Sequence, residues 1–312
     1  MTINEILTPS FNSVRRFRDR RPMWQRRLSA ESAFCRACVS QGYLTQEQME
    51  HAAQRYRLGR SRDDGVIFWQ INQLGQIYDG KIMYYRDDCH RDHQRHPNWV
   101  SHLLKHHYGC QNLDIPTIHC LFGTHLVNEN ENEDENEDEN EDENEDENVN
   151  QNENLNENEN VNENEDENQN ENSVIPLCSA KKVNVNVHVP VSNCVAVVES
   201  EKSAVILSEW FPQCLWLATG GLNELTAVKL FPLRGRKVIL FPDTDSQGRA
   251  FELWYQVARE AQRLLGQPIT VSPLLEQRAT VDQKARKIDL VDFLFEAHVN
   301  ENENLNENSF SL

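Results

Sequence analysis

Acidic residues stand at the ends of two apolar segments of this 312-residue chain, where they could hold a metal ion. Glu199 ends the apolar segment Cys194–Glu199, and Asp243 and Asp245 form a D-x-D pattern just after Lys237–Phe241. Side chains two positions apart in an extended chain point to the same side. Three carboxylates, with water and phosphate in the remaining positions, suit Mg²⁺ or Mn²⁺. The pattern therefore predicts a divalent-metal site formed by these three residues.

The D-x-D pattern also has a purely structural interpretation. An aspartate after a strand commonly caps the following helix, because its carboxylate accepts hydrogen bonds from backbone amides there. The metal interpretation is favoured because Glu199 and the D-x-D pattern stand together at matching ends of two predicted strands. At the level of sequence, both interpretations stay open.

The elements that would position these acids alternate between apolar strands and helices. One predicted helix covers 200–211 and another Ala250–Leu265. Strands that are apolar throughout and alternate with helices predict an α/β fold, with a parallel sheet covered by helices on both faces. Function in such sheets lies at the carboxyl ends of the strands, which here selects Glu199, Thr219–Gly221 and Asp243–Asp245. The four predicted strands are Cys194–Glu199, Leu215–Thr219, Lys237–Phe241 and Pro268–Ser272.

The first half of the chain has a different pattern, which predicts a small α+β unit. Leu44–Tyr56 reads as a helix with Thr45 as its N-cap and Gln48 at the capping-box position. Two segments rich in β-branched and aromatic residues flank a Gly-containing turn and predict a hairpin. These are Val66–Ile71 and Gln76–Tyr85. Pro97–His107 is expected to form a short helix.

An acidic low-complexity segment, residues 128–172, dominates the charge of the chain. It holds 22 of the 50 acidic residues and no Lys or Arg, so the rest of the chain has 31 basic and 28 acidic residues. The net charge of −19 therefore describes an insert, and an acidic nucleic-acid mimic is excluded for the remainder. With no apolar face to bury, we expect the insert to be disordered. We divide the chain into a basic helical segment (1–62), the α+β unit (63–127), the insert (128–172), the α/β domain (173–299) and a disordered tail (300–312).

The motifs around the three acids resemble the toprim domain, which bacterial-type DNA primases, type IA topoisomerases and several nucleases share. They are V-V-E-S-E-K from Val197, A-T-G-G from Ala218 and L-F-P-D-T-D-S-Q-G-R-A from Leu240. The resemblance implies a toprim-type parallel sheet in which Glu199, Asp243 and Asp245 are the catalytic and metal-binding residues. A third acidic position is expected downstream, where Asp289 stands with Asp292. The turn glycines that match the pattern are Gly220, Gly221 and Gly248.

The upstream segment resembles the small domain that precedes toprim in bacterial-type primases. Val66–Ile71, Gly75, Lys81–Tyr85 and the L-F-G of 121–123 stand in the expected order. The combination of the two parts is also similar to toprim proteins of unknown function in Bacteroidota mobile elements, and the resemblance covers roughly residues 60–127 and 190–297. The resemblance thus implies a primase-like α+β subdomain in front of the toprim-like sheet.

We therefore expect metal-dependent, primase-like nucleotidyl transfer on DNA for a mobile element, with Mg²⁺ or Mn²⁺ as cofactor and replication or mobilisation proteins as partners. Two alternatives stay open: a non-catalytic accessory protein that binds DNA or a partner, and a toprim nuclease. A cytoplasmic location is expected from eight Cys without a secretory signal, and no run of 18 apolar residues predicts a membrane span. The expected phosphate contacts are Lys202, Arg60, Arg62, Lys81 and Arg86.

Two further segments have the composition of metal sites, but a simpler structural interpretation is favoured for each. Primases usually begin with a four-ligand zinc ribbon, whereas here only Cys35 and Cys38 have pair spacing, and Cys89 lies far along the chain. Two ligands do not close a structural zinc site, so buried thiols on a helical turn are favoured. The His-rich segment 88–96 follows a predicted strand and precedes a helix, which favours a solvated connection.

Overall fold

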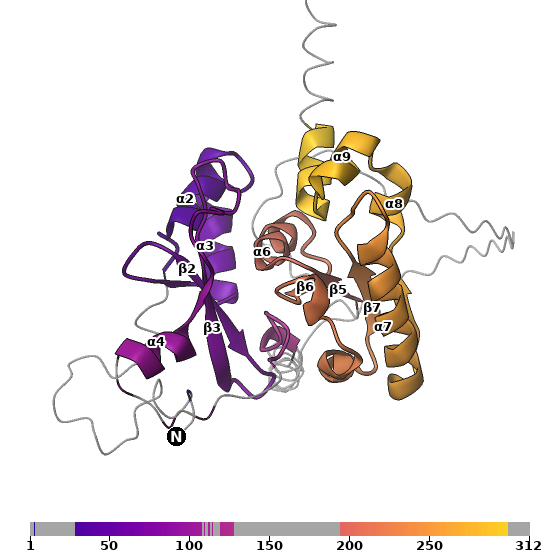
Figure 1. The fold of residues 1–312 in the computed structure, drawn as a ribbon, viewed down its shortest axis with the longest axis horizontal. Helices are drawn as coiled ribbons and strands as arrows, with labels where there is room; N and C mark the ends of the chain where they lie inside the picture. The colour runs from indigo at the N-terminus through magenta and orange to yellow at the C-terminus, as the bar shows by residue number, and fades with distance from the viewer. Residues whose placement is uncertain are drawn as a thin grey trace, which may run out of the picture.

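The computed structural model describes residues 29–107, 119–127 and 194–298, together with residues 3, 109, 112 and 114. Residues 1, 2 and 4–28 of the basic N-terminal segment, the acidic insert and the tail lie outside the described residues. The expected disorder of the insert and the tail therefore also lies outside them. The part of the chain that the structure describes has two sheets (Figure 1). No helix in that part is long and apolar enough to cross a membrane.

The first sheet is antiparallel and has the strand order β1-β2-β3-β4. Its centre is the predicted hairpin, in which Val66 pairs with Met83 and Phe68 with Lys81. One face packs against α2 and α3, and the other against α4. The elements are α2 (Ala33–Ser40), α3 (Gln46–Arg55), β1 (Gly59–Arg60), β2 (Val66–Ile71), β3 (Ile77–Met83), β4 (Asn98–Trp99) and α4 (Val100–His107).

Local sequence signals account for the helices of this half. The capping box of α3 forms as expected: Gln48 N–H donates to Thr45 Oγ1 over 3.2 Å, and Thr45 N–H donates to Gln48 Oε1 over 2.9 Å. Cys35 and Cys38 are buried on α2, which Ser32 caps, so the expected helical turn with buried thiols is present. Part of the segment predicted as a separate N-terminal unit therefore packs directly on the first sheet.

The second sheet is parallel and has the order β6-β5-β7-β8, flanked by helices. This confirms the predicted α/β architecture with its parallel sheet. The strands are β5 (Cys194–Val198), β6 (Leu215–Ala218), β7 (Lys237–Phe241) and β8 (Ile269–Val271). The helices are α6 (Glu201–Trp210), α7 (Arg249–Leu265), α8 (Leu274–Arg278), α9 (Val281–Arg286), the 3₁₀ helices η3 (Leu222–Glu224) and η4 (Ala227–Leu233), and a last helix over 290–298.

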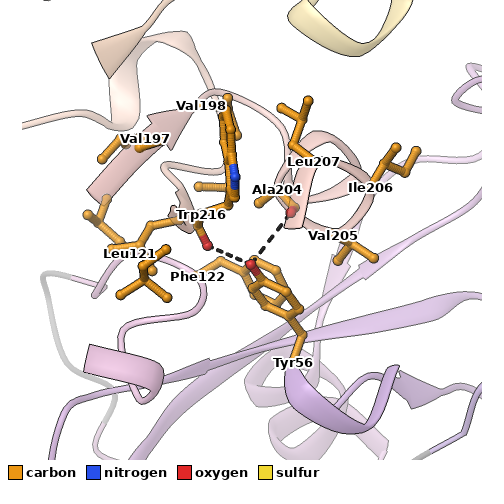
Figure 2. Close-up of a cluster of buried hydrophobic side chains, with 14 of the residues drawn as sticks. Tyr56, Leu121, Phe122, Val197, Val198, Ala204, Val205, Ile206, Leu207 and Trp216 are labelled. Atoms are coloured by element: carbon orange, nitrogen blue, oxygen red, sulfur yellow. Dashed lines mark hydrogen bonds between the residues drawn. The ribbon is translucent and has the colours of Figure 1, made fainter. Parts of the chain in front are cut away.

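A single hydrophobic core joins the two halves. Tyr56, at the end of α3, is fully buried between the sheets, and its hydroxyl donates to the carbonyl of Trp216 in β6 over 2.7 Å (Figure 2). Phe122 stacks on Tyr56 and forms a backbone bridge to Ala218, also in β6. Because these contacts bury aromatic surface of both halves together, the antiparallel sheet is held in a fixed position beside the parallel one.

Candidate metal and phosphate site

Two of the predicted acids lie at the switch point of the parallel sheet. The chain runs from β5 outward to β6 on one side, and from β7 outward to β8 on the other, so the direction of winding reverses between β5 and β7. Val198 and Phe241 are the last paired residues of these strands; Glu199 follows Val198 directly, and Asp243 follows Phe241 after one proline. Crevices at such switch points are where open α/β sheets bind ligands. The fold thus places this carboxylate pair where a ligand is expected.

The acids at this edge repel one another. Burial, then the charge of Glu199, then that of Asp289 raise the pKa of Asp243 well above its ordinary value. Burial raises the pKa of Glu199 as well, and the charges of Asp289 and Glu201 add to the shift. Partly buried carboxylates that disfavour each other's charge in this way are neutralised by a proton or by a cation. The edge can therefore attract a positively charged ligand.

Asp245 has a different role from its neighbour in the D-x-D pattern. Its Oδ2 accepts from the amide of Ala250 over 2.9 Å and its Oδ1 from that of Gln247 over 2.8 Å. Burial acts to raise the pKa of Asp245, but these hydrogen bonds outweigh it and hold the pKa below its ordinary value. Both oxygens thus anchor the beginning of α7, which is the structural interpretation of the pattern.

Asp289 and Asp292 surround an internal lysine. Lys202, on α6, is 6% exposed, and its Nζ lies 3.5 Å from Asp289 Oδ2 and 3.3 Å from Asp292 Oδ1. Although burial acts against its charge, these two carboxylates raise the pKa of Lys202 well above its ordinary value. Asp289 also accepts from the Asp292 amide at the start of the last helix and from Ser203 Oγ on α6. The downstream acids thus serve as a helix cap and as the counterions of Lys202.

A pocket of about 230 Å³ opens in front of this edge, between the two sheets. Lys81 reaches into it from β3, and its Nζ donates to Glu201 Oε1 over 2.9 Å and to the carbonyl of Gly220 over 2.6 Å. Gly220 has φ +87°, and a Cβ there would lie 3.0 Å from Glu201 Oε1, so a glycine is required. The lining residues are Lys81, Met83, Tyr85, His90, Arg91, Glu199, Ser200, Glu201, Lys202, Gly220, Gly221 and Asp289.

The predicted phosphate contacts divide between the pocket and the surface. Lys81 and Lys202 line the pocket, each paired with carboxylates. Arg60 and Arg86 lie elsewhere: Arg60 pairs with Asp64 over 2.7 Å and Arg86 with Asp88 over 2.6 Å. Arg62 is exposed and lies outside the pocket lining. The phosphate contacts of these three arginines stay predictions, since no contact joins their side chains to the pocket.

Sequence reasoning missed several residues of the pocket lining, two of them in the His-rich segment. His90 and Arg91 belong to the His-rich segment 88–96 that we expected to be a solvated connection, and they are exposed, yet both line the pocket. Both residues line the pocket because the loop after β3 lies close to the parallel sheet, and no local sequence pattern encodes this tertiary contact. Gly221 and Gly248, predicted as turn positions, lie after β6 and at the start of α7, and Gly248 has φ +66°.

The residues fit a smaller metal site than the sequence predicted. Within the residues that the structure describes, no three His, Cys, Asp or Glu side chains are arranged to hold an ion together. Asp245 caps α7 and Asp289 faces Lys202, which leaves Glu199 and Asp243. Mg²⁺ is often held by one or two carboxylates together with water and substrate phosphates. Glu199 and Asp243, whose charges act on each other, are the two carboxylates that remain as candidates for such a site.

A family model described as "Domain of unknown function (DUF6371)" matches residues 34–135 and 185–244. This is 162 of the 312 residues, just over half of the chain. The chain belongs to this family. No match was found among curated proteins or among solved structures. The matched residues contain Lys81, Glu199 and Asp243, and the match is interrupted across most of the acidic insert.

Proposed function

We propose that this protein is a divalent-metal-dependent nucleic-acid enzyme of the toprim class, with primase-like nucleotidyl transfer on DNA for a mobile element as its reaction. The proposal includes the finer fold: a toprim-type parallel sheet preceded by a primase-like subdomain. The observation that carries it is the carboxylate pair Glu199 and Asp243 at the switch point, of which Glu199 lines a pocket that also presents cationic side chains. Acids beside cations in one pocket suit a phosphate ester bound through a metal ion.

In this proposal Glu199 and Asp243 hold the metal through one carboxylate each. A bound Mg²⁺ supplies charge neutralisation on the phosphate and orients the attacking and leaving oxygens. Lys81 is a positioning residue. Its ammonium donates to Glu201 and to the Gly220 carbonyl and so fixes the turn after β6 beside the first sheet. His90 and Arg91, exposed at the pocket, are the groups available to phosphates of an incoming strand.

The accessory-protein alternative is favoured by one observation. Asp245, the second carboxylate of the D-x-D pattern, is hydrogen-bonded to the amides of α7, so fewer ligands remain for a metal than the toprim resemblance implies. A protein of this second kind would bind DNA through Arg91 and its neighbours in a salt-sensitive way without divalent metal, and would show no turnover.

The proposal is tested with a labelled single-stranded DNA, nucleoside triphosphates and a titration of Mg²⁺ or Mn²⁺. We expect extension products that depend on the metal, at least a hundredfold loss in Asp243→Asn (on the order of what one charged group in phosphoryl transfer contributes), and most activity kept in Asp245→Asn. The second variant is a matched control, because asparagine also caps helices well. Shortened DNA in place of extended DNA would assign a nuclease instead. Metal-independent DNA binding without turnover would overturn the enzyme assignment.

A further inference from the structure

Two cysteines that are distant in sequence meet beside the pocket. Cys38 on α2 and Cys89 in the turn after β3 are both fully buried, and their Sγ atoms lie 3.3 Å apart. No disulfide joins them in this structure, and both thiols are reduced. A disulfide has an S–S length of about 2.05 Å, so the sulfur atoms need to approach by little more than about 1 Å. The geometry points to a pair of thiols that is poised to be oxidised.

The backbone at Cys89 supports a specific role for its side chain. Cys89 has φ +60°, in the left-handed region that Gly or Asn usually occupies. The turn is fixed by the Cys89 amide, which donates to the Arg86 carbonyl over 3.0 Å, and by the Arg86 amide, which donates to the His90 carbonyl over 2.9 Å. A β-carbon in this conformation is tolerated where its side chain has a use. Here that side chain is the thiol that faces Cys38.

The position of the turn connects the thiol pair to the candidate site. His90 and Arg91, which follow Cys89 directly, line the pocket. On the other side, Lys202 is near enough for its charge to act on Cys38, although burial dominates and raises the pKa of that thiol. A covalent bond from Cys89 to α2 would therefore fix the pocket wall that carries the exposed side chains of His90 and Arg91.

We propose that Cys38 and Cys89 form a reversible disulfide that tethers the pocket wall to α2. The oxidant is a low-molecular-weight disulfide such as oxidised glutathione. In the first step one thiolate attacks its S–S bond and releases one glutathione thiol. In the second the other cysteine attacks the mixed disulfide and releases another. The protein loses two electrons and two protons, and the oxidant gains both as two thiols. Since the pair is buried, exchange requires transient opening of the turn.

The neighbouring thiols provide internal comparisons. Cys35 lies one turn earlier on α2 and is equally buried, but its Sγ contacts the Ser32 hydroxyl at 3.2 Å. Cys214 is hydrogen-bonded to Cys194 at the amino ends of β5 and β6, away from the pocket. A test must therefore identify which cysteines are joined and not only count the thiols that are lost.

The experiment equilibrates the full chain with glutathione buffers of increasing oxidised fraction, in urea below the unfolding transition so that the turn can open. The protein is then alkylated and mapped by mass spectrometry. We expect one peptide pair that joins Cys38 to Cys89, about 2 Da lighter than its reduced parts because two hydrogens are lost. Cys38→Ser and Cys89→Ser abolish it, whereas Cys35→Ser keeps it. In the oxidised wild type, amide exchange of residues 86–91 slows and Tm rises by about 5–10 °C.

Three results would overturn the proposal. The first is the absence of the joined peptide at every glutathione ratio, while unfolded protein is oxidised in the same buffers. The second is a cross-link that uses Cys35, or only the pair Cys194 and Cys214. The third is one zinc ion retained per reduced chain by native mass spectrometry and lost in both Cys35→Ser and Cys89→Ser, since three thiols would then serve a metal.

Discussion

The acidic residues at the carboxyl edge of the parallel sheet differ in role because their oxygens meet different partners. Asp245 meets backbone amides, Asp289 meets the Lys202 ammonium and a serine hydroxyl, and Asp243 meets the charges of other carboxylates. Residue type and spacing suggested one shared metal site for all of them. The environment separates them, because hydrogen bonds and counterions stabilise the ionised form whereas like charges destabilise it.

Lys202 is expected to be a strong determinant of stability. Lys202→Met leaves the buried Asp289 and the half-buried Asp292 without their counterion, and breaking a buried ion pair in this way costs about 3–5 kcal/mol. Urea unfolding at neutral pH measures the loss. Lys237→Met makes the same chemical change at an exposed position and should stay within about 0.5 kcal/mol of wild type. Equal losses in the two variants would show that the internal cluster does not depend on the ammonium.

His125 should give the protein a pH-dependent stability. Burial, aided by the charge of Arg57, lowers the pKa of His125 to about 4 in the folded protein, against about 6.5 when unfolded. Between these values the unfolded chain binds a proton that the folded chain does not, so stability falls as pH drops from about 6.5 to about 4, by up to about 3 kcal/mol. Above that window, both forms are neutral and the contribution is absent.

Substitution isolates this effect. In His125→Gln the amide can still donate to the Arg55 carbonyl, which His125 Nε2 contacts at 3.2 Å, but it does not titrate. The wild type should therefore lose more stability than the variant between pH 7 and pH 4 in denaturant titrations. Two parallel pH profiles would contradict the assignment of the effect to this histidine.

Among the elements, the beginning of α7 depends on Asp245. We expect Asp245→Ala to destabilise the protein by about 1 kcal/mol, because the amides of Ala250 and Gln247 lose their acceptor. Asp245→Asn should cost less than that, since its amide oxygen can still accept from one of the two backbone amides. Chemical denaturation of the two variants gives the comparison. A loss of similar size in both would mean that the negative charge matters and not the cap.

The elements were mostly predictable from local patterns, and the exceptions have physical reasons. Val66–Ile71 and Lys237–Phe241 are strands with the predicted bounds, because each is a short apolar segment rich in β-branched residues. By contrast, β1 and β4 have two residues each, too few for any periodicity, and they form only because the hairpin edges offer unpaired backbone groups. The 3₁₀ helices after β6 likewise carry no repeat that sequence reasoning could detect.

At the scale of the molecule, the sequence did not reveal how the two halves join. Lys81 and Glu201 are 120 positions apart, and Cys38 and Cys89 are 51 apart, yet each pair is in contact. The first contact depends on the docking of one sheet against the other, and the second on the packing of α2 against the first sheet, and neither follows from a motif. The carboxyl-edge rule for parallel sheets located Glu199 and Asp243, but it could not indicate that the first sheet would close a pocket over Glu199.

This joint core predicts that the chain can be divided within the acidic insert without separating its halves. Residues 1–127 and 173–312, produced together as two chains, should elute as one complex in size-exclusion chromatography, because Tyr56 and Phe122 pack into the parallel-sheet half. Tyr56→Phe leaves the Trp216 carbonyl without its donor and should weaken the association by about tenfold. Halves that elute separately, each with its own cooperative unfolding, would contradict a single core.

The most direct test of the account is whether Glu199 and Asp243 bind a divalent cation, measured as thermal unfolding with chelator and with excess Mn²⁺. For the wild type we predict a Tm increase of about 5–10 °C at saturating metal. Asp243→Asn should unfold at a higher temperature than the wild type in chelator, because one repelling charge is removed, and should not respond to Mn²⁺. A wild type that is indifferent to Mn²⁺, or an Asp243→Asn variant that keeps the full metal response, would contradict the account.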